Sequence, residues 1–462
     1  MKKILWDDKE LKEIFSQNID LSTPITGASI DTRTMSKGDM FFGIRGKNFD
    51  GNSFIDQAFS KGASLCFSDN IEKVSKINRS RVIKVNDIMQ ILNLLAKYRR
   101  KSLKAKVIAV TGSVGKTSTK EMMKIGLSSH GETFATIGNF NNHLGLCLSL
   151  INCPKDIKFC ILELGMSASN EISELVEIVA PNISVITNVN PVHLRFLNST
   201  LEIVNAKCEI FDNTKCLEYA FLNRDSLHYD IQLQKAASKG ITVFTFGLDK
   251  EANCYIKEIH TLERVKIAKI ICFGEEYKVT FNINVGNHLI YNSPTVFILA
   301  KVLGLDLRLI GENLQSFLPI SGRGNAMNLP NNVKLIDESY NSNPTSLLKA
   351  LQHTLSFRNH YRRVIAVLGD MKELGDNEVE YHKNIDLTGI DILFCVGPLM
   401  RSLYDNACYS NLIKKKWSEN SLKMAQIVTD YIKEDDIILV KGSLEMRMKI
   451  IVETIKSRFK YE

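Results

Sequence analysis

The stretch that decides the fold is VIAVTGSVGKTS, residues 107–118. Residues 107–110 are apolar, as in a buried strand, and the segment from Thr117 to Leu127 has the pattern of a helix. Glycines between a strand and a helix let backbone N–H groups approach an anion, and the N-terminus of the helix adds partial positive charge. The stretch therefore predicts a phosphate-binding loop in an α/β domain.

This loop departs from the common spacing Gly-x-x-x-x-Gly-Lys-Ser/Thr, because Val110 stands where the first glycine is expected. Lys116 is predicted to neutralise the β- and γ-phosphates of ATP, and the Thr117 hydroxyl to bind Mg²⁺. The alternative is a tight turn with an exposed lysine, which the flanking strand and helix disfavour. The predicted ATP-binding residues of the loop are Thr111, Gly112, Ser113, Val114, Gly115, Lys116, Thr117 and Ser118.

Polar residues follow two later strands. Glu163 lies at the end of the apolar run 160–164, and His193 comes after the run 184–187. Ligands of open α/β sheets bind outside the carboxyl ends of strands, and an ionised acid is rarely buried without a cation. Glu163 is therefore a candidate Mg²⁺ ligand, with a solvated glutamate at a strand edge as the open alternative. A lone histidine is more often structural, and Lys207 reads on its own as an ordinary helix lysine.

The overall composition favours small anionic substrates. Lys and Arg number 59 against 51 Asp and Glu, a surplus of 8 that is spread along the chain. The dense basic run at 414–416 is short and predicts a solvated surface, so we expect no nucleic-acid binding. The ten cysteines form no Cys-x-x-Cys pair, and many lie in apolar runs, which indicates a reducing compartment. No segment has the length and apolar character of a membrane span or a signal peptide. We therefore expect a cytoplasmic protein, by default a monomer.

The 462 residues suggest about three domains. Alternating strands and helices predict an α/β fold with a mainly parallel sheet around the phosphate loop. Within that domain, residues 253–285 suggest an antiparallel hairpin insertion and residues 287–303 a single helix. The expected divisions are a small α/β domain at 1–104, a central P-loop domain at 105–318 and a second, Rossmann-like α/β domain at 319–462.

The shortened loop Thr-Gly-x-x-Gly-Lys-Thr resembles that of the Mur ligases, ATP-dependent enzymes that form amide bonds in peptidoglycan precursor synthesis. Further segments resemble the same family in the same order. They are SIDTR at 29–33, GDMFFGIRG at 38–46, GNFNNHLG at 138–145, DESYNSNP at 337–344, LGDMKELG at 368–375 and VKGS at 440–443.

The last three of these segments resemble the family member that joins D-alanyl-D-alanine to UDP-N-acetylmuramoyl-tripeptide through an acyl phosphate. The Asp-Asn-Pro-Arg stretch of the member that adds the third amino acid does not occur in the chain. The resemblance implies that the first domain binds the UDP-sugar, the central domain binds ATP, and the third binds the dipeptide and closes on ATP. The implied co-substrate is ATP and the implied metal Mg²⁺. The implied partners are the two small-molecule substrates.

The resemblance also implies roles for single residues. Lys207 matches a lysine that CO₂ carbamylates in related ligases, which converts it into an anionic Mg²⁺ ligand beside Thr117, Glu163 and His193. The implied catalytic residues are Lys116, Lys207, Glu163 and His193, and Asn292, Arg323 and Asp337 join the ATP-binding set. The implied substrate-binding residues are Ser29, Asp31, Arg33, Gly46, Asn139, Asn141, Asn142, Tyr340, Asn341 and Asn343.

The chain departs from the family pattern at Arg195, Leu197, Leu289 and Pro294. Two other functions remain open at this point. One is a different member of the same ligase group, such as a diaminopimelate- or lysine-adding enzyme or folylpolyglutamate synthase. The other is a P-loop NTPase that switches or moves a partner protein, which would need no second α/β domain. Whether the third residue of the tripeptide is diaminopimelate or lysine is not encoded in any of these motifs.

Overall fold

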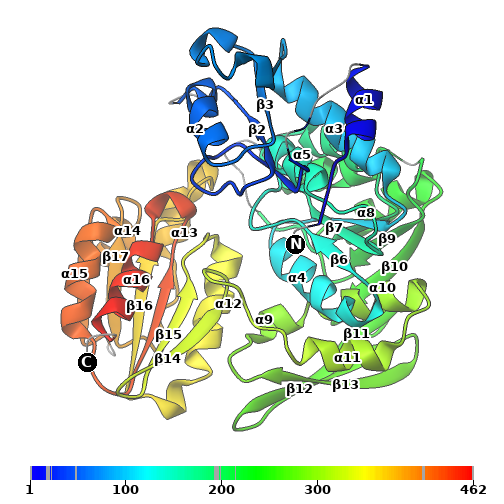
Figure 1. Cartoon of the computed structure of the whole chain (residues 1–462). Coiled ribbons are helices and arrows are strands. Elements are labelled where there is room, and N and C mark those ends of the chain that lie inside the picture. Colours follow the sequence, from blue (N-terminus) through cyan, green and yellow to red (C-terminus); the bar gives the residue numbers. More distant parts are fainter. Residues whose placement is uncertain are drawn as a thin grey trace.

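The computed structural model describes residues 3–16, 21, 23–46, 49–191, 197, 199–213, 215–407 and 412–459. Its strands form sheets of four, nine and six strands that follow one another along the chain (Figure 1). Most neighbouring strands are parallel, and helices connect them. The predicted α/β class is therefore confirmed.

The first sheet is small and entirely parallel, in the order β1-β2-β3-β4. Helix α3 begins at the cap Asp87, buries an apolar face that includes Leu92 and Leu95, and ends in a basic turn. The elements of this unit are α1 (Asp8–Phe15), β1 (Gly27–Ser29), β2 (Asp39–Phe42), α2 (Ile55–Ser60), β3 (Leu65–Ser68), β4 (Val82–Lys84) and α3 (Ile88–Ser102).

The nine-stranded sheet carries the phosphate loop. Its order is β13-β12-β11-β10-β9-β8-β5-β7-β6, so the loop strand β5 lies between β8 and β7. Alternate residues of β5 enter different cores: Val107 and Ala109 pack with the first unit, while Ile108 and Val110 pack on the opposite face. The elements up to β10 are β5 (Lys106–Thr111), α4 (Lys116–Gly126), β6 (Thr133–Ala135), α5 (His143–Ile151), β7 (Phe159–Glu163), α6 (Glu171–Val179), β8 (Ile183–Ile186), α7 (Thr200–Cys208), β9 (Tyr219–Asn223), α8 (Tyr229–Ser238) and β10 (Thr242–Gly247).

Two sequence predictions need correction here. The antiparallel pairing expected at 253–285 is present, but it comprises three strands and not the two of a hairpin, and they extend the main sheet through the β10–β11 pair. The single helix expected at 287–303 is two helices, because Pro294 has no N–H to donate and instead begins the second one. These elements are β11 (Cys254–Thr261), β12 (Val265–Cys272), β13 (Glu275–Asn282), α9 (Asn287–Ile290), α10 (Pro294–Val302) and α11 (Leu307–Leu314).

The third sheet has the order β14-β15-β19-β16-β17-β18, and only the β14–β15 pair is antiparallel. The basic run at 414–416 begins its edge strand β18, where Lys415 donates to two backbone carbonyls, so that run is only partly solvated. The elements are β14 (Asn325–Leu329), β15 (Val333–Glu338), α12 (Pro344–Leu355), β16 (Arg363–Gly369), α13 (Glu378–Lys383), β17 (Ile392–Val396), α14 (Met400–Asn406), β18 (Lys414–Ser418), α15 (Ser421–Tyr431), β19 (Asp436–Lys441) and α16 (Lys449–Arg458).

Two negative findings concern the described ranges. No helix in them combines the length and apolar character needed to cross a bilayer. The nine cysteines that lie in these ranges are all free, and all except Cys216 are buried. The tenth, Cys408, lies outside the described residues.

Trp6 joins the first unit to the central one. Its side chain is fully buried, its indole N–H donates to the carbonyl of Ile151 at 2.9 Å, and the Arg99 guanidinium lies 4.0 Å from its ring centroid. We expect Trp6→Ala to lower the free energy of unfolding by about 3–5 kcal/mol, measured by urea denaturation, because it leaves a large cavity. Trp6→Phe keeps most of the packing and loses the hydrogen bond, so an equal loss in both variants would contradict this explanation.

Candidate active site

The phosphate loop spans residues 112–115, between the end of β5 and the start of α4. Gly112 has φ +146°, and a Cβ there would lie 1.9 Å from the Thr187 hydroxyl. Gly115 has φ +84°, and its Cβ position lies 3.1 Å from Asn292 Oδ1. Both positions therefore require glycine, for conformational and for steric reasons. The second contact places Asn292, in the turn between α9 and α10, against the loop, and its role in ATP binding remains a prediction.

The lysine of the loop lies over the loop itself. Lys116 Nζ donates to the carbonyl of Gly112 at 2.7 Å. The pKa of Lys116 is lowered overall, mainly by burial and also by the charge of Arg323, while the Glu163 carboxylate acts in the opposite direction. Lys116 thus interacts electrostatically with Arg323 of the third unit.

Glu163 lies at the end of β7, as predicted, and is not the solvated glutamate of the alternative interpretation: its side chain is 1% exposed. Its Oε2 accepts from the Thr117 hydroxyl at 2.8 Å and its Oε1 from Asn141 Nδ2 at 2.9 Å. A hydroxyl and a carboxylate oxygen side by side are the donor types that Mg²⁺ takes, with phosphate and water supplying the other ligands. The residues fit that ion, although the described residues hold no cluster of three His, Cys, Asp or Glu side chains.

The neighbouring strand β8 holds the loop in place through residues that the sequence analysis did not single out. Thr187 Oγ1 and Asn188 Nδ2 donate to the carbonyl of Val114 at 2.6 and 3.1 Å. Asn188 Oδ1 accepts from the N–H of Val114 at 3.0 Å. The polar run directly after the strand at 184–187 was the available signal, because β8 pairs with β5. His193, predicted from that same run, lies outside the described residues.

Lys207 lies on α7, and its side chain is 1% exposed. Burial lowers its pKa well below the usual value, and the charge of Lys116 lowers it further. Lys207 is not among the described residues that line the central cavity. Its predicted place near the metal remains a prediction.

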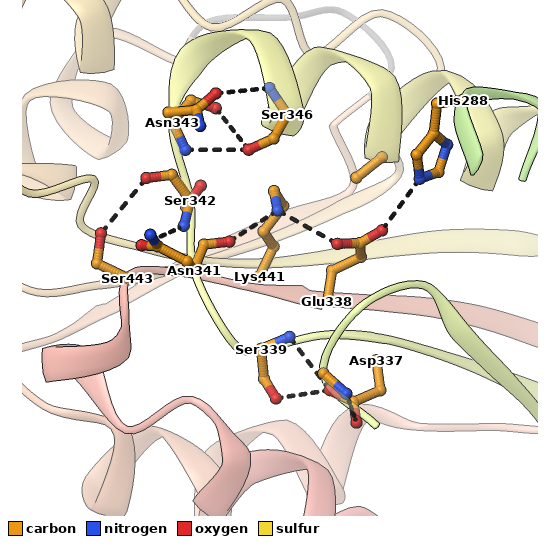
Figure 2. A network of polar contacts seen from close by, with 12 residues as sticks. His288, Asp337, Glu338, Ser339, Asn341, Ser342, Asn343, Ser346, Lys441 and Ser443 are labelled. Carbon is orange, nitrogen blue, oxygen red and sulfur yellow. Dashed lines mark hydrogen bonds and ion pairs between the residues drawn. The ribbon is translucent and has the colours of Figure 1, made fainter. Parts of the chain in front are cut away.

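The linker into the third unit is held by Asp337, which is fully buried at the end of β15. The Asp337 carboxylate accepts from the Gly322 N–H at 2.8 Å and from the Ser321 hydroxyl at 3.1 Å. It also accepts from the Ser339 hydroxyl at 2.6 Å (Figure 2). Asp337 therefore fixes the linker that carries Arg323, and its own contact with ATP stays a prediction. The Arg323 guanidinium lies 3.8 Å from the ring centroid of Tyr340.

Residues 340–346 form a second wall. Asn343 caps α12 by accepting from the Ser346 N–H at 2.8 Å, so the capped turn foreseen as an alternative is present. That turn nevertheless faces the same space as the phosphate loop. A cavity of about 1090 Å³ is lined by Met89 of α3, by the loop and by this wall, and thus by all three units. The predicted site residues that line this cavity are Ser113, Val114, Gly115, Lys116, Ser118, Asn141, Asn142, Glu163, Asn292, Arg323, Tyr340, Asn341 and Asn343.

The predicted residues of the first unit do not reach this cavity in the described structure. Asp31 and Arg33 form an exposed ion pair at 2.7 Å, and Ser29 Oγ accepts from the Asp31 N–H. Gly46 donates its N–H to the carbonyl of Phe49. The assignment of these residues to the UDP-sugar remains a prediction. Asn139 of the central unit is exposed and does not line the cavity either, so its substrate-binding role also remains a prediction.

Three family models match: "Mur ligase family, catalytic domain" at residues 24–100, "Mur ligase middle domain" at 110–300 and "Mur ligase, glutamate ligase domain" at 322–444. A UDP-N-acetylmuramoyl-tripeptide–D-alanyl-D-alanine ligase of Rickettsia prowazekii is 32% identical, over 97% of this chain and 99% of the relative. The chain belongs to the Mur ligase family.

Other relatives agree with this result. The ligase of the same name from Bacillus subtilis is 31% identical over 94% of this Mur ligase and 93% of the relative. A crystal structure of MurF from Acinetobacter baumannii superposes with a TM-score of 0.82 at 25% identity, covering 98% and 99% of the two chains. MurF from Thermotoga maritima in complex with ADP has a TM-score of 0.77 at 26% identity, covering 94% of this chain and 98% of that one.

Three departures from the family pattern now have a physical setting. Leu289 is buried, and its Cδ1 lies 3.2 Å from the Cβ position of Gly324, so it packs under the interdomain linker. Pro294 begins α10, and Leu197 is buried in the core shared with the first unit. Arg195 lies outside the described residues.

The loop lysine gives the most direct test of the site. We expect Lys116→Ala to lower kcat at least about 10²-fold, because it removes a preorganised cation from the phosphates. Phosphate release at saturating substrates measures the change. Lys106→Ala is the control, since Lys106 is a partly exposed lysine at the start of β5, before the loop, and pairs with Glu218. Wild-type turnover by Lys116→Ala would refute the site.

Proposed function

We propose that this Mur ligase joins D-alanyl-D-alanine to UDP-N-acetylmuramoyl-tripeptide and converts ATP to ADP and phosphate. One observation of the structure carries the proposal: the Lys116 loop and the wall at 340–346 line one cavity to which all three units contribute. Relatives that carry this activity as their name match along more than nine-tenths of both chains. The reaction brings two anions together, which requires convergent positive charge.

The reaction is proposed to proceed in two steps. A carboxylate oxygen of the tripeptide attacks the γ-phosphorus of ATP, the bond to the bridging oxygen breaks, and its electron pair stays on ADP. The amine of D-alanyl-D-alanine then attacks the acyl carbon, loses a proton and expels phosphate. In the first step Lys116 and the N-terminus of α4 stabilise the charge on the phosphates, while Arg323 contributes from the third unit.

The sites for Mg²⁺ are part of the proposal. Thr117 and Glu163 would hold one ion, and His193 and a carbamylated Lys207 a second. When bound, the ion would neutralise charge on the phosphate oxygens. Hydrogen bonds of the protein hold the loop in place. Glu163 accepts from Thr117 and Asn141, and Asn188 accepts from the backbone N–H of Val114.

The three units divide the work in this proposal. Residues 1–104 bind the UDP-sugar, residues 105–318 bind ATP, and residues 319–462 bind the dipeptide through Tyr340, Asn341 and Asn343 and close on ATP. The free cysteines of the described ranges support a reducing, cytoplasmic location. We assign no protein partner and propose a monomer.

Substrate-dependent phosphate release tests the proposed function. We expect release with ATP only when UDP-N-acetylmuramoyl-tripeptide and D-alanyl-D-alanine are both present, because the acyl phosphate otherwise has no acceptor. A tripeptide ending in diaminopimelate and one ending in lysine are compared in parallel. Release that needs only a protein partner, or that follows free amino acids in place of the dipeptide, would overturn the assignment.

Carbamylation of Lys207 has its own test. Only a neutral amine attacks CO₂, and the lowered pKa of Lys207 favours that form. We expect isotope-labelled bicarbonate to give a carbamate carbon signal by NMR in the wild type and not in Lys207→Ala. Activity of the wild type should fall when bicarbonate is removed. An unmodified Lys207 in fully active, bicarbonate-replete enzyme would disprove the modification.

A further inference from the structure

Lys441 lies at the carboxyl end of β19, an interior strand of the third sheet. Its register partner on β15 is Glu338. The Lys441 side chain is 2% exposed, and its Nζ donates to the carbonyl of Asn341 at 2.9 Å and lies 3.4 Å from Glu338 Oε2. Both residues line the central cavity. A cation is thus held where ligands of parallel sheets bind.

Glu338 keeps this lysine in a defined place and in its charged form. Burial alone would raise the pKa of Glu338, but the charge of Lys441 and the His288 imidazole hold that pKa at about 2. Burial lowers the pKa of Lys441, and the Glu338 carboxylate raises it. Figure 2 shows the ammonium group between the Asn341 carbonyl and Glu338, with His288 of α9 approaching Glu338 from the other side at 3.6 Å.

The charge of Arg323 connects Lys441 to the phosphate loop. It lowers the pKa of Lys441 and also that of Lys116, so it lies within electrostatic range of both amines. Lys116, Arg323 and Lys441 all line the cavity, so three cations from two units contribute to its wall. Such a cluster repels itself and is costly unless an anion occupies the region between the charges.

A purely structural ion pair does not explain this arrangement. A buried salt bridge contributes little net stability, because desolvation cancels most of the attraction and well-packed apolar residues serve as well. The pair lies against the cavity, not in the core behind the sheet. Its charged end also contacts the backbone carbonyl of Asn341, a residue of the cavity wall at 340–346.

We propose that Lys441 is a further catalytic residue, whose ammonium group contacts the phosphoryl group during its transfer and in the acyl phosphate, and that Glu338 positions it. The inference rests on the ligase function proposed above. Lys441 forms and breaks no covalent bond. It stabilises the negative charge that develops on the non-bridging oxygens of the phosphoryl group, and it acts from the third unit, whereas Lys116 acts from the central one.

The main experiment separates catalysis from folding. Lys441→Gln leaves the Glu338 carboxylate buried without its cation, so it is compared with the double variant Lys441→Gln/Glu338→Gln, in which both charges are removed together. We expect kcat for phosphate release to fall about 10²–10³-fold in both, the usual effect of losing one donor to a transition-state oxyanion. KM for UDP-N-acetylmuramoyl-tripeptide should stay near the wild-type value, and thermal unfolding of the double variant should approach the wild type.

Lys415→Gln is the matched control, because Lys415 lies in the same sheet and donates to two backbone carbonyls away from the cavity. It should keep the wild-type kcat. If the double variant regains kcat together with stability, Lys441 is structural and the proposal is wrong. A wild type that does not ligate at all refutes the proposed function, whereas a ligating wild type matched by Lys441→Gln refutes only this inference.

Glu338→Gln tests the positioning role through the pH profile. The groups that face Lys441 are Glu338 of β15 and Arg323 of the linker, with His288 of α9 behind Glu338. Without the carboxylate, the pKa of Lys441 falls, and its charged form is lost at lower pH. We expect the basic limb of the pH profile of kcat to move to lower pH in Glu338→Gln. At pH values below that limb, where Lys441 is charged again, kcat should recover. A loss of equal size at every pH would contradict positioning by Glu338.

Discussion

The carboxylate of Glu163 ties the phosphate loop to its neighbouring strand, and the other parts of the site depend on this contact. A carboxylate that is 1% exposed must be hydrogen-bonded or paired with a cation, and Glu163 takes its hydrogen bonds from Thr117 and Asn141. Three separate segments of the chain therefore meet at one side chain. The result is a loop whose lysine and helix N-terminus both face the cavity.

A second buried acid, Asp337, holds the linker into the third unit by hydrogen bonds. Its oxygens accept from the backbone and side chains of the linker at 321–322, so the linker enters the third sheet in one conformation. Arg323 is thereby stacked on Tyr340 and held within electrostatic range of Lys116. The next residue, Glu338, links Lys441 to His288 of the central unit. Buried acids at the carboxyl ends of strands thus hold the cations of both units around one cavity.

Much of the fold could be predicted from local patterns, because apolar runs and glycines report directly on strands, helices and turns. The strands around residues 107–110, 160–164 and 184–187 are examples. The arrangement of the strands at 254–282 was less predictable. Alternation at period two indicates strands, but it does not say which edge of a sheet they will join. The division of the helix at 287–303 follows from Pro294, a local signal whose effect depends on what precedes it.

The sequence by itself determined the phosphate loop, the acid at the end of β7 and the resemblance to the Mur ligases, because each lies in a contiguous motif whose spacing has a direct physical meaning. Only the tertiary structure decided which polar residues support these motifs. Asn188 holds the loop because β8 lies beside β5, and Glu338 meets Lys441 because β19 lies beside β15 although 103 residues separate them. Neighbours in a parallel sheet are set by crossover connections and by packing, and no local pattern encodes them.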